Sequence, residues 1–173
     1  MGSYLRNWWR GTKGATAVEF SLIGVPFVLM TIGIVEMALM FTTQSMLQES
    51  TFAASRLIRT GQIQQSPGGN QEQMFRDAVC DFASLLIPCD DIQFQVSEVP
   101  SFADADDNPP EFDDDGNLLD TGFDPGADSS VIVIRVVYNY PVRTPLMQQW
   151  LSTRDGGVRT LLSTMVLQTE PYQ

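Results

Sequence analysis

The feature that most constrains this chain is an apolar run at residues 20–41 (FSLIGVPFVLMTIGIVEMALMF), in which Glu36 is the only ionisable residue. As a helix that rises about 1.5 Å per residue, the run is roughly 33 Å long, enough to cross a hydrocarbon core of about 30 Å. A cleaved secretory signal peptide is the alternative interpretation. However, the run exceeds the usual apolar region of about 7 to 15 residues, and no small-x-small cleavage site closes it. We therefore predict a retained membrane anchor.

Charges are distributed unevenly on the two sides of this run. The 173-residue chain has 10 Lys+Arg and 21 Asp+Glu, a formal net charge of −11. Residues 1–14 carry three of the cations and no acid, whereas residues 102–130 carry ten acids and no cation. By the positive-inside rule, we expect the N-terminus to be cytoplasmic and the C-terminal body to lie on the other side of the membrane. The acidic balance, with no basic stripe after residue 13, argues against nucleic acid as a partner.

Composition also limits the chemistry. The chain contains no histidine, so Ser-His-Asp and Cys-His nucleophilic sites, His-ligated zinc and imidazole bases cannot be formed from its residues. Catalysis by paired carboxylates needs acids in different and rigid environments, which the acidic segment is not expected to provide. We therefore predict that the protein is not an enzyme and uses no cofactor.

The spacing of apolar residues predicts an α+β fold with a long N-terminal helix. Residues 42–60 contain no Gly or Pro and repeat apolar residues at three-to-four spacing, so the anchor continues as an amphipathic helix to about residue 60. Gly61 then supplies a C-terminal stop, and Arg56 and Arg59 suit the negative end of the helix dipole. The predicted organisation is a basic leader at 1–14, the helix at 15–60, with the membrane span at about 20–41, and a periplasmic domain at 61–173.

The domain is predicted to hold one further helix and about three antiparallel strands. Asn70 is expected to cap a helix that ends at Pro88, with Gln73 completing the cap. The apolar face of this helix is expected to comprise Met74, Phe75, Val79, Phe82, Leu85 and Leu86. Strands are predicted at 92–99, 131–140 and 158–169, with a long acidic loop at 101–130 and a short helix or loop at 144–155. The last strand is ambiguous, because its leucines and methionine also fit a helix.

Cys80 and Cys89 are the only cysteines, and they lie nine positions apart. On the oxidising side of a bacterial membrane, two cysteines at this spacing are expected to form a disulfide, which contributes about 2 to 3 kcal/mol through loop entropy. Two buried free thiols are the alternative. A zinc site is not expected, because two cysteines without histidine leave the metal short of soft ligands.

The start of the anchor carries a more specific signal. A basic leader ends at Gly14, four small or apolar residues follow, and Glu19 precedes Phe20 at the head of the apolar run. An ionised carboxylate is costly in hydrocarbon and needs a partner. Cleavage after Gly14 would give Ala15 a positive α-amine, which could neutralise Glu19 of a neighbouring subunit. Such a pair adds little stability over an apolar pair, but it strongly penalises a wrong register.

This junction resembles the class III signal of type IV prepilins, in which a peptidase cuts after Gly and Glu is the fifth residue of the mature chain. The stretch GATAVEFSLIGVPFVLMTIGIVEMALM, with Pro26 early and Glu36 late, is similar to the TadE-like minor pilins, or pseudopilins, of tight-adherence (Flp) pilus systems. The segment AASRLIRTGQ at 53–62, the cysteine pair and a C-terminal Glu-Pro-Tyr also resemble that family.

The resemblance implies a non-enzymatic protein of the inner membrane that acts in pilus assembly or initiation. Its implied partners are a prepilin peptidase, other pilin and pseudopilin subunits that contact the N-terminal helix, the inner-membrane assembly platform and membrane lipid. Glu19 and Phe20 would set the register of the assembly, and Glu36 would either pair with a partner helix or reach the headgroups. The alternative is a membrane-anchored periplasmic scaffold or calcium-responsive adhesin outside any filament, with Gly14 and Glu19 as ordinary flanking residues.

The acidic loop contains a weak candidate calcium site formed by Glu111, Asp113, Asp115 and Asp120. The first three of these acids match the first three ligand positions of an EF-hand loop. The twelfth position, which needs a bidentate Glu, is Gly122, so the match to an EF-hand is poor. A solvated acidic loop is the default expectation.

Overall fold

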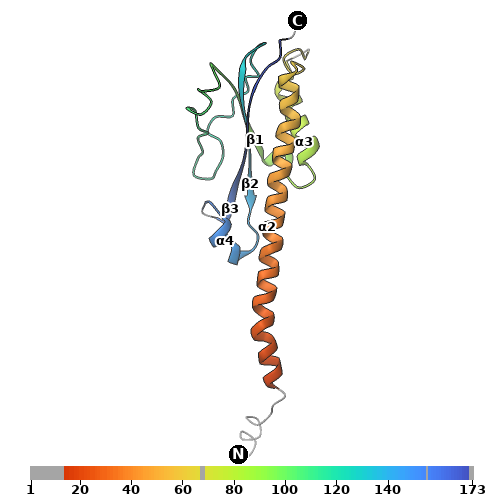
Figure 1. The fold of residues 1–173 in the computed structure, drawn as a ribbon, viewed down its shortest axis with the longest axis vertical. Coiled ribbons are helices and arrows are strands. Elements are labelled where there is room, and N and C mark those ends of the chain that lie inside the picture. Colours follow the sequence, from red (N-terminus) through yellow and green to blue (C-terminus); the bar gives the residue numbers. More distant parts are fainter. Residues whose placement is uncertain (1–13, 67–68, 155, 172–173) are drawn as a thin grey trace, which may run out of the picture.

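The computed structural model describes residues 14–66, 69–154 and 156–171. Figure 1 shows one long helix, α2 (Ala15–Arg59), with a small domain packed along its C-terminal part. The other elements are α3 (Gln71–Ala83), a 3₁₀ turn (Cys89–Asp91), β1 (Ile92–Val99), β2 (Val131–Pro141), α4 (Pro145–Leu151) and β3 (Val158–Gln168). The predicted α+β fold, a long N-terminal helix followed by a small domain with a helix and three antiparallel strands, is confirmed.

Helix α2 ends where the sequence supplies a stop. Gly61 has a φ of 73°, and its N–H donates to the carbonyl of Ile58 (3.1 Å), which satisfies one of the last free carbonyls of the helix. The N–H of Glu170 donates to the carbonyl of Arg59 (2.8 Å), and the two side chains form an ion pair at 3.3 Å. The C-terminal segment is therefore tied to the same end of α2.

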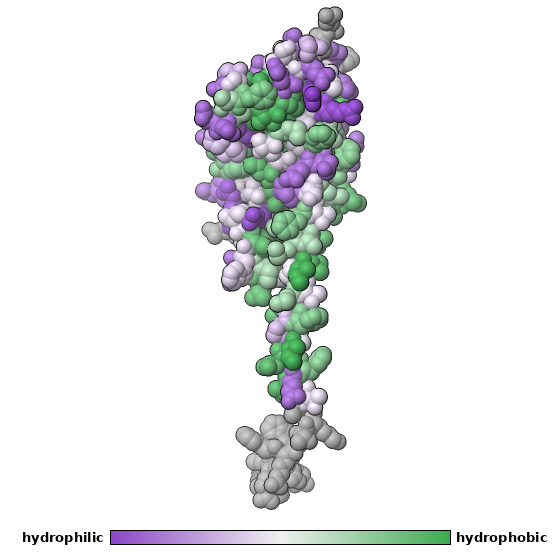
Figure 2. All heavy atoms as spheres, viewed as in Figure 1, coloured by the Kyte–Doolittle hydropathy of each residue, from purple (hydrophilic) through white to green (hydrophobic). Residues whose placement is uncertain are grey.

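One stripe of α2 is buried by the domain, and this stripe begins at Gly33. Its members recur at three-to-four spacing, as expected for one face of a helix: Gly33, Glu36, Met40, Thr43, Leu47, Ser50, Ala54 and Ile58. By contrast, every residue from 16 to 32 is exposed except Gly24, which is half-buried beside the ring of Phe20 on the same helix. Figure 2 shows this uncovered part of the helix as a narrow, largely hydrophobic stalk. The stretch free of domain contact thus ends before residue 41, where hydropathy places the end of the span.

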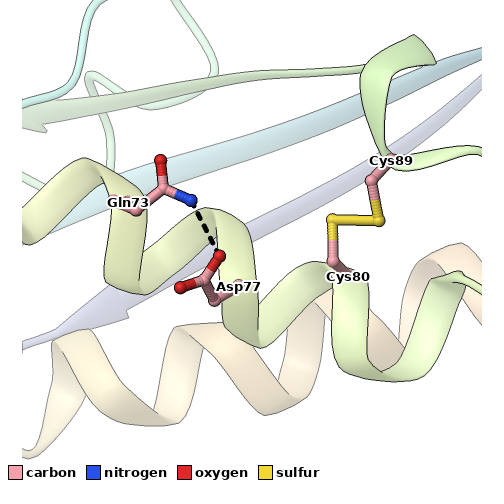
Figure 3. Close-up of a disulfide and its surroundings, with 4 residues drawn as sticks. All are labelled: Gln73, Asp77, Cys80 and Cys89. Carbon is pink, nitrogen blue, oxygen red and sulfur yellow. Dashed lines mark hydrogen bonds between the residues drawn. A yellow bond between two sulfur atoms is a disulfide. The ribbon is translucent and has the colours of Figure 1, made fainter.

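Helix α3 differs from its prediction in its cap and in its end. Asn70 occupies the N-cap position, but its side chain makes no cap hydrogen bond, because its φ of −92° and ψ of 31° lie outside the extended region that capping needs. Gln73 instead donates to the carboxylate of Asp77 (2.8 Å), as Figure 3 shows. The helix ends at Ala83 and does not continue to Pro88.

The predicted apolar face of α3 is only partly correct. The buried residues of the helix are Phe75, Val79 and Ala83, at successive four-residue spacing. Phe82, which was expected on this face, is exposed, as are the leucines at 85 and 86 that follow the helix. The face of α3 that packs against α2 and the sheet is therefore rotated about the axis of α3, away from the face that the apolar residues of its sequence predict.

The strands form one antiparallel sheet in the order β1-β2-β3. Ile92 of β1 pairs with Tyr138 of β2, and Val131 of β2 pairs with Gln168 of β3. β2 is buried on both faces over its first eight residues, which agrees with its nearly continuous apolar sequence. The final segment is a strand and not a helix, because it completes this sheet along the full length of β2.

Alternate residues of the sheet face α2 and α3 and form the main core. Ile132, Ile134 and Val136 of β2 pack there with Phe94 of β1 and Phe75 of α3. The two phenylalanine rings lie 5.1 Å apart, edge to face. This core fixes the domain on the long helix.

The acidic loop at 101–130 covers the free edge of β1. The N–H of Val96 donates to the carbonyl of Gly122 (2.9 Å), and the N–H of Asp124 donates to the carbonyl of Val96 (2.8 Å). Covering an edge strand in this way removes unpaired backbone groups from solvent. Figure 1 shows this loop on one side of the sheet and α2 with α3 on the other.

Candidate functional site

The predicted processing junction lies at the first turn of α2. The helix begins at Ala15, and Gly14 occupies the N-cap position with a φ of −88° and a ψ of −23°. Any residue type accepts this conformation, and a Cβ atom at Gly14 would meet no described atom within 4 Å. The fold therefore gives no conformational or steric reason for a glycine here. A requirement for glycine at this position would come from another molecule, as in a protease recognition site. Residues 1–13, the rest of the predicted leader, lie outside the described residues.

Glu19 and Phe20 lie on the part of α2 that the domain leaves uncovered, and both side chains are exposed. The large apolar side chains on this part, such as Ile23 and Phe27, are exposed as well. The helix is long and apolar enough to span a membrane. Among the described residues, Glu19 has no ion-pair partner. A lone carboxylate on such a surface needs a partner once lipid or other helices surround it.

Glu36 joins the helix to the domain. Its side chain is buried, with 7% of the residue exposed. The carboxylate accepts hydrogen bonds from the backbone N–H of Arg143 (3.0 Å) and from the hydroxyl of Thr144 (2.7 Å), the N-cap residue of α4. Burial raises the pKa of the nearby Tyr140 hydroxyl, and the negative charge of Glu36 raises it further. Glu36 therefore links α2 to the start of α4 within the same chain. Neither of the two roles predicted for it, pairing with a partner helix or reaching the headgroups, included this contact.

A comparison with known families finds a match in this helix. Residues 14–56 match the family described as TadE-like protein. Over these residues, the chain is similar to that family. The match starts at Gly14, includes Glu19 and Glu36, and ends before α2 does, so it covers the junction but no part of the domain. No curated protein and no solved structure matches the chain.

The C-terminal domain contains a disulfide between Cys80 and Cys89, as predicted. The two Cα atoms lie 5.6 Å apart. Figure 3 shows the link between α3, which carries Cys80, and the 3₁₀ turn that begins at Cys89 and leads into β1. The disulfide therefore fixes the end of α3 relative to the first strand of the sheet.

Two of the four acids of the candidate calcium loop have hydrogen-bond partners within the domain. Asp113 accepts from the backbone N–H (2.7 Å) and the side-chain amide (3.0 Å) of Asn117. Asp120 accepts from the N–H of Gly122 (2.9 Å) and the amide of Gln95 (2.7 Å). Within the described ranges, no group of three or more His, Cys, Asp or Glu side chains converges. These two carboxylates organise the turns of the loop.

Arg135 is a structural residue that sequence reasoning did not single out. It lies in the middle of β2, only 3% exposed, on the face covered by the acidic loop. Its guanidinium donates to the side-chain oxygen of Gln95 (2.7 Å) and to the backbone carbonyl of Asn108. Burial lowers the pKa of Arg135, and the charge of Asp120 opposes this change. The only signal in the sequence was a single charge inside an otherwise apolar strand.

The pKa values of Asp113 and Asp120 predict a pH dependence of the loop. Hydrogen bonds from Asn117 lower the pKa of Asp113 below its ordinary value of 3.8, and those from Gly122 and Gln95 lower the pKa of Asp120. Because both pKa values are lowered in the folded chain, these bonds stabilise the loop fully above about pH 4 and are lost as the pH falls through the folded values.

NMR titration of the carboxyl carbons tests this pH dependence. Both midpoints are expected below 3.8. The variant Asn117→Ala should move the Asp113 midpoint upward and leave that of Asp120 unchanged. Midpoints at or above 3.8 in the unmodified chain would contradict the hydrogen bonds described for the loop.

Proposed function

We propose that this TadE-like chain is a non-enzymatic minor pilin, or pseudopilin, of a tight-adherence type IV pilus system, and that it acts in pilus assembly or initiation. The family points to a protein associated with the tight-adherence pilus. The observation that carries the proposal is the family match that starts at Gly14, the residue directly before α2. The matched residues include the junction and the part of α2 on which the proposed processing and assembly depend.

In this proposal, the N-terminal part of α2 anchors the chain in a bacterial inner membrane. The uncovered residues 16–32 supply the apolar surface that lipid requires. The three cations of residues 1–13 favour a cytoplasmic N-terminus, and this argument rests on sequence because those residues lie outside the described ranges. The acidic, disulfide-containing domain suits the oxidising periplasm.

A prepilin peptidase cuts this chain after Gly14, and the mature chain starts at Ala15. The new α-amine is then four residues, or about 6 Å along the helix axis, from Glu19. When two such helices lie side by side with that offset, the amine of one meets the carboxylate of the other. Phe20 and the neighbouring apolar side chains pack around this pair. The partners are other pilin and pseudopilin subunits and the inner-membrane assembly platform.

Mass spectrometry of the protein purified from its native host tests the processing step. The expected chain begins at Ala15, which removes three of the ten cations and changes the formal charge from −11 to 7 − 21 = −14. Gly14→Val should leave the leader attached. Because a Cβ at position 14 meets no described atom, a loss of cleavage would report recognition and not misfolding.

Gly11→Val is the matched control for this experiment, and it should be cleaved normally. An intact N-terminus in the unmodified protein would contradict the proposal. That result would favour the alternative of a membrane-anchored periplasmic protein that is never incorporated in a filament.

A further inference from the structure

Helix α4 is held against the side of α2 at the end of the domain nearest the uncovered stalk, as Figure 1 shows. Met147 of α4 packs on Gly33, where its side-chain atoms lie 3.2 Å from the position of an added Cβ. One turn further along α2, Glu36 accepts the hydroxyl hydrogen bond of Thr144, the N-cap residue of α4. Two independent contacts therefore fix the height of α4 along the long helix.

The side of α4 that faces away from the domain is apolar and exposed. Leu146 is 50% exposed and Trp150 is 79% exposed, the highest value among the large apolar side chains of the described residues. The two residues are four positions apart, so they lie on the same face of the helix. Arg143 and Gln149, both exposed, lie beside them in the sequence. This combination of a tryptophan, a leucine and flanking polar groups is typical of a protein segment at a membrane surface.

We propose that α4 rests in the headgroup region of the bilayer that α2 spans, with Trp150 and Leu146 inserted toward the acyl chains. The occupant of this exposed face is a phospholipid bilayer. The inference rests on the membrane anchoring in the proposed function and extends it to a second contact with lipid. α4 would thereby set how far the domain stands from the membrane and limit its rotation about α2.

The length of the uncovered helix supports this placement. From Ala15 to Gly33 the helix advances 18 residues, about 27 Å, which is close to the hydrocarbon thickness of about 30 Å. If the span instead ended at Phe41, as hydropathy alone predicts, the membrane surface would lie about 12 Å beyond Gly33 along a perpendicular helix. Arg143 and Gln149 would then be immersed in hydrocarbon, where exposed charged and polar groups are strongly disfavoured. The contact at Gly33 therefore marks the membrane surface better than the end of the apolar run.

Depth-dependent fluorescence quenching in liposomes tests the proposal. For this test, the full chain is made with the substitutions Trp8→Phe and Trp9→Phe, which leave Trp150 as the only tryptophan. Phosphatidylcholine brominated at shallow or at deep positions of the acyl chain is the quencher. We expect a blue shift of Trp150 emission on reconstitution and a greater loss of emission with shallow bromines than with deep ones. Emission that neither shifts nor is quenched would overturn the proposal.

In two matched variants, Trp8, Trp9 and Trp150 are all replaced by Phe, and a single tryptophan is placed elsewhere on α2. Phe27→Trp lies in the uncovered part and should be quenched most by deep bromines, whereas Phe52→Trp lies beside the domain and should not be quenched; both phenylalanines are exposed. If Phe27→Trp is quenched and Trp150 is not, the anchor stands and the α4 contact is wrong. If Phe27→Trp is not quenched, the membrane anchoring itself is wrong. A blue shift of Trp150 emission that appears only at high protein density, without quenching by the brominated lipid, would assign this face to a second copy of the chain and would also overturn the lipid contact.

Discussion

Replacing Glu19 with alanine is expected to abolish pilus assembly while leaving cleavage after Gly14 intact. If the chain is cleaved and assembled as proposed, the new α-amine of Ala15, with an ordinary pKa of about 7.7 to 8.0, is largely protonated at neutral pH and needs a negative partner. Removing one member of a buried ion pair leaves an uncompensated charge, which costs about 3 to 5 kcal/mol. At about 1.4 kcal/mol per factor of ten, each docking step would weaken by more than roughly a hundredfold.

The structure supports Glu19 as the partner because its carboxylate is exposed, has no ion-pair partner among the described residues and lies on the surface that the domain leaves uncovered. Electron microscopy of the cells measures pili, and mass spectrometry of the same cells measures cleavage. Glu49→Ala is the matched control, because Glu49 is an exposed acid on the same helix but lies beside the domain. Cells with Glu49→Ala should make normal pili. Normal piliation with Glu19→Ala would show that this carboxylate does not set the register.

Phe75→Ala is expected to destabilise the domain by about 3 to 5 kcal/mol, the usual cost of deleting a fully buried aromatic side chain. Phe75 is 0% exposed, and its ring contacts those of Phe94 at 5.1 Å and Phe123 at 5.6 Å between centroids. The substitution therefore removes the contact through which α3 holds β1 and the end of the acidic loop. A loss of this size is a large fraction of the about 5 to 15 kcal/mol that stabilises a typical domain.

Urea denaturation of the full chain in detergent, followed by near-ultraviolet circular dichroism, measures this loss. Phe82→Ala is the matched control: it removes the same side chain from the same helix, at a site that is 58% exposed. The free energy of unfolding of Phe82→Ala should stay within about 0.5 kcal/mol of that of the unmodified chain. Equal effects of the two substitutions would show that the packing of α3 described here is wrong.

This pair of phenylalanines shows where prediction from sequence succeeds and where it fails. Both residues fit the apolar face of a helix, because periodicity records only the angles between side chains on their own helix. Which of them is buried depends on the line along which α3 meets α2 and the sheet. That line is set by the shapes of all three elements, and no local pattern contains it.

Prediction was most accurate where the physics is local. The stop of α2 at Gly61 follows from the backbone freedom of glycine, and the strands Ile92–Val99 and Val131–Pro141 follow from alternating or continuous apolar residues. The junction of Gly14 and Glu19 with the apolar run is also a contiguous pattern, and the family match begins there, but cleavage at Gly14 and the role of Glu19 stay predictions.

The sequence by itself determined the order of the elements, the apolar run and the charge difference between its two sides, because each depends on residues close together in the chain. Only the tertiary structure decided that Glu36 bonds to the β2–α4 connection 107 residues later, that Arg135 holds the acidic loop and that the uncovered helix ends at Gly33. Hydropathy treats residues 20–41 as one span because it averages side chains along the chain. The domain ends the uncovered part earlier, because α4 packs on α2 before the apolar sequence stops.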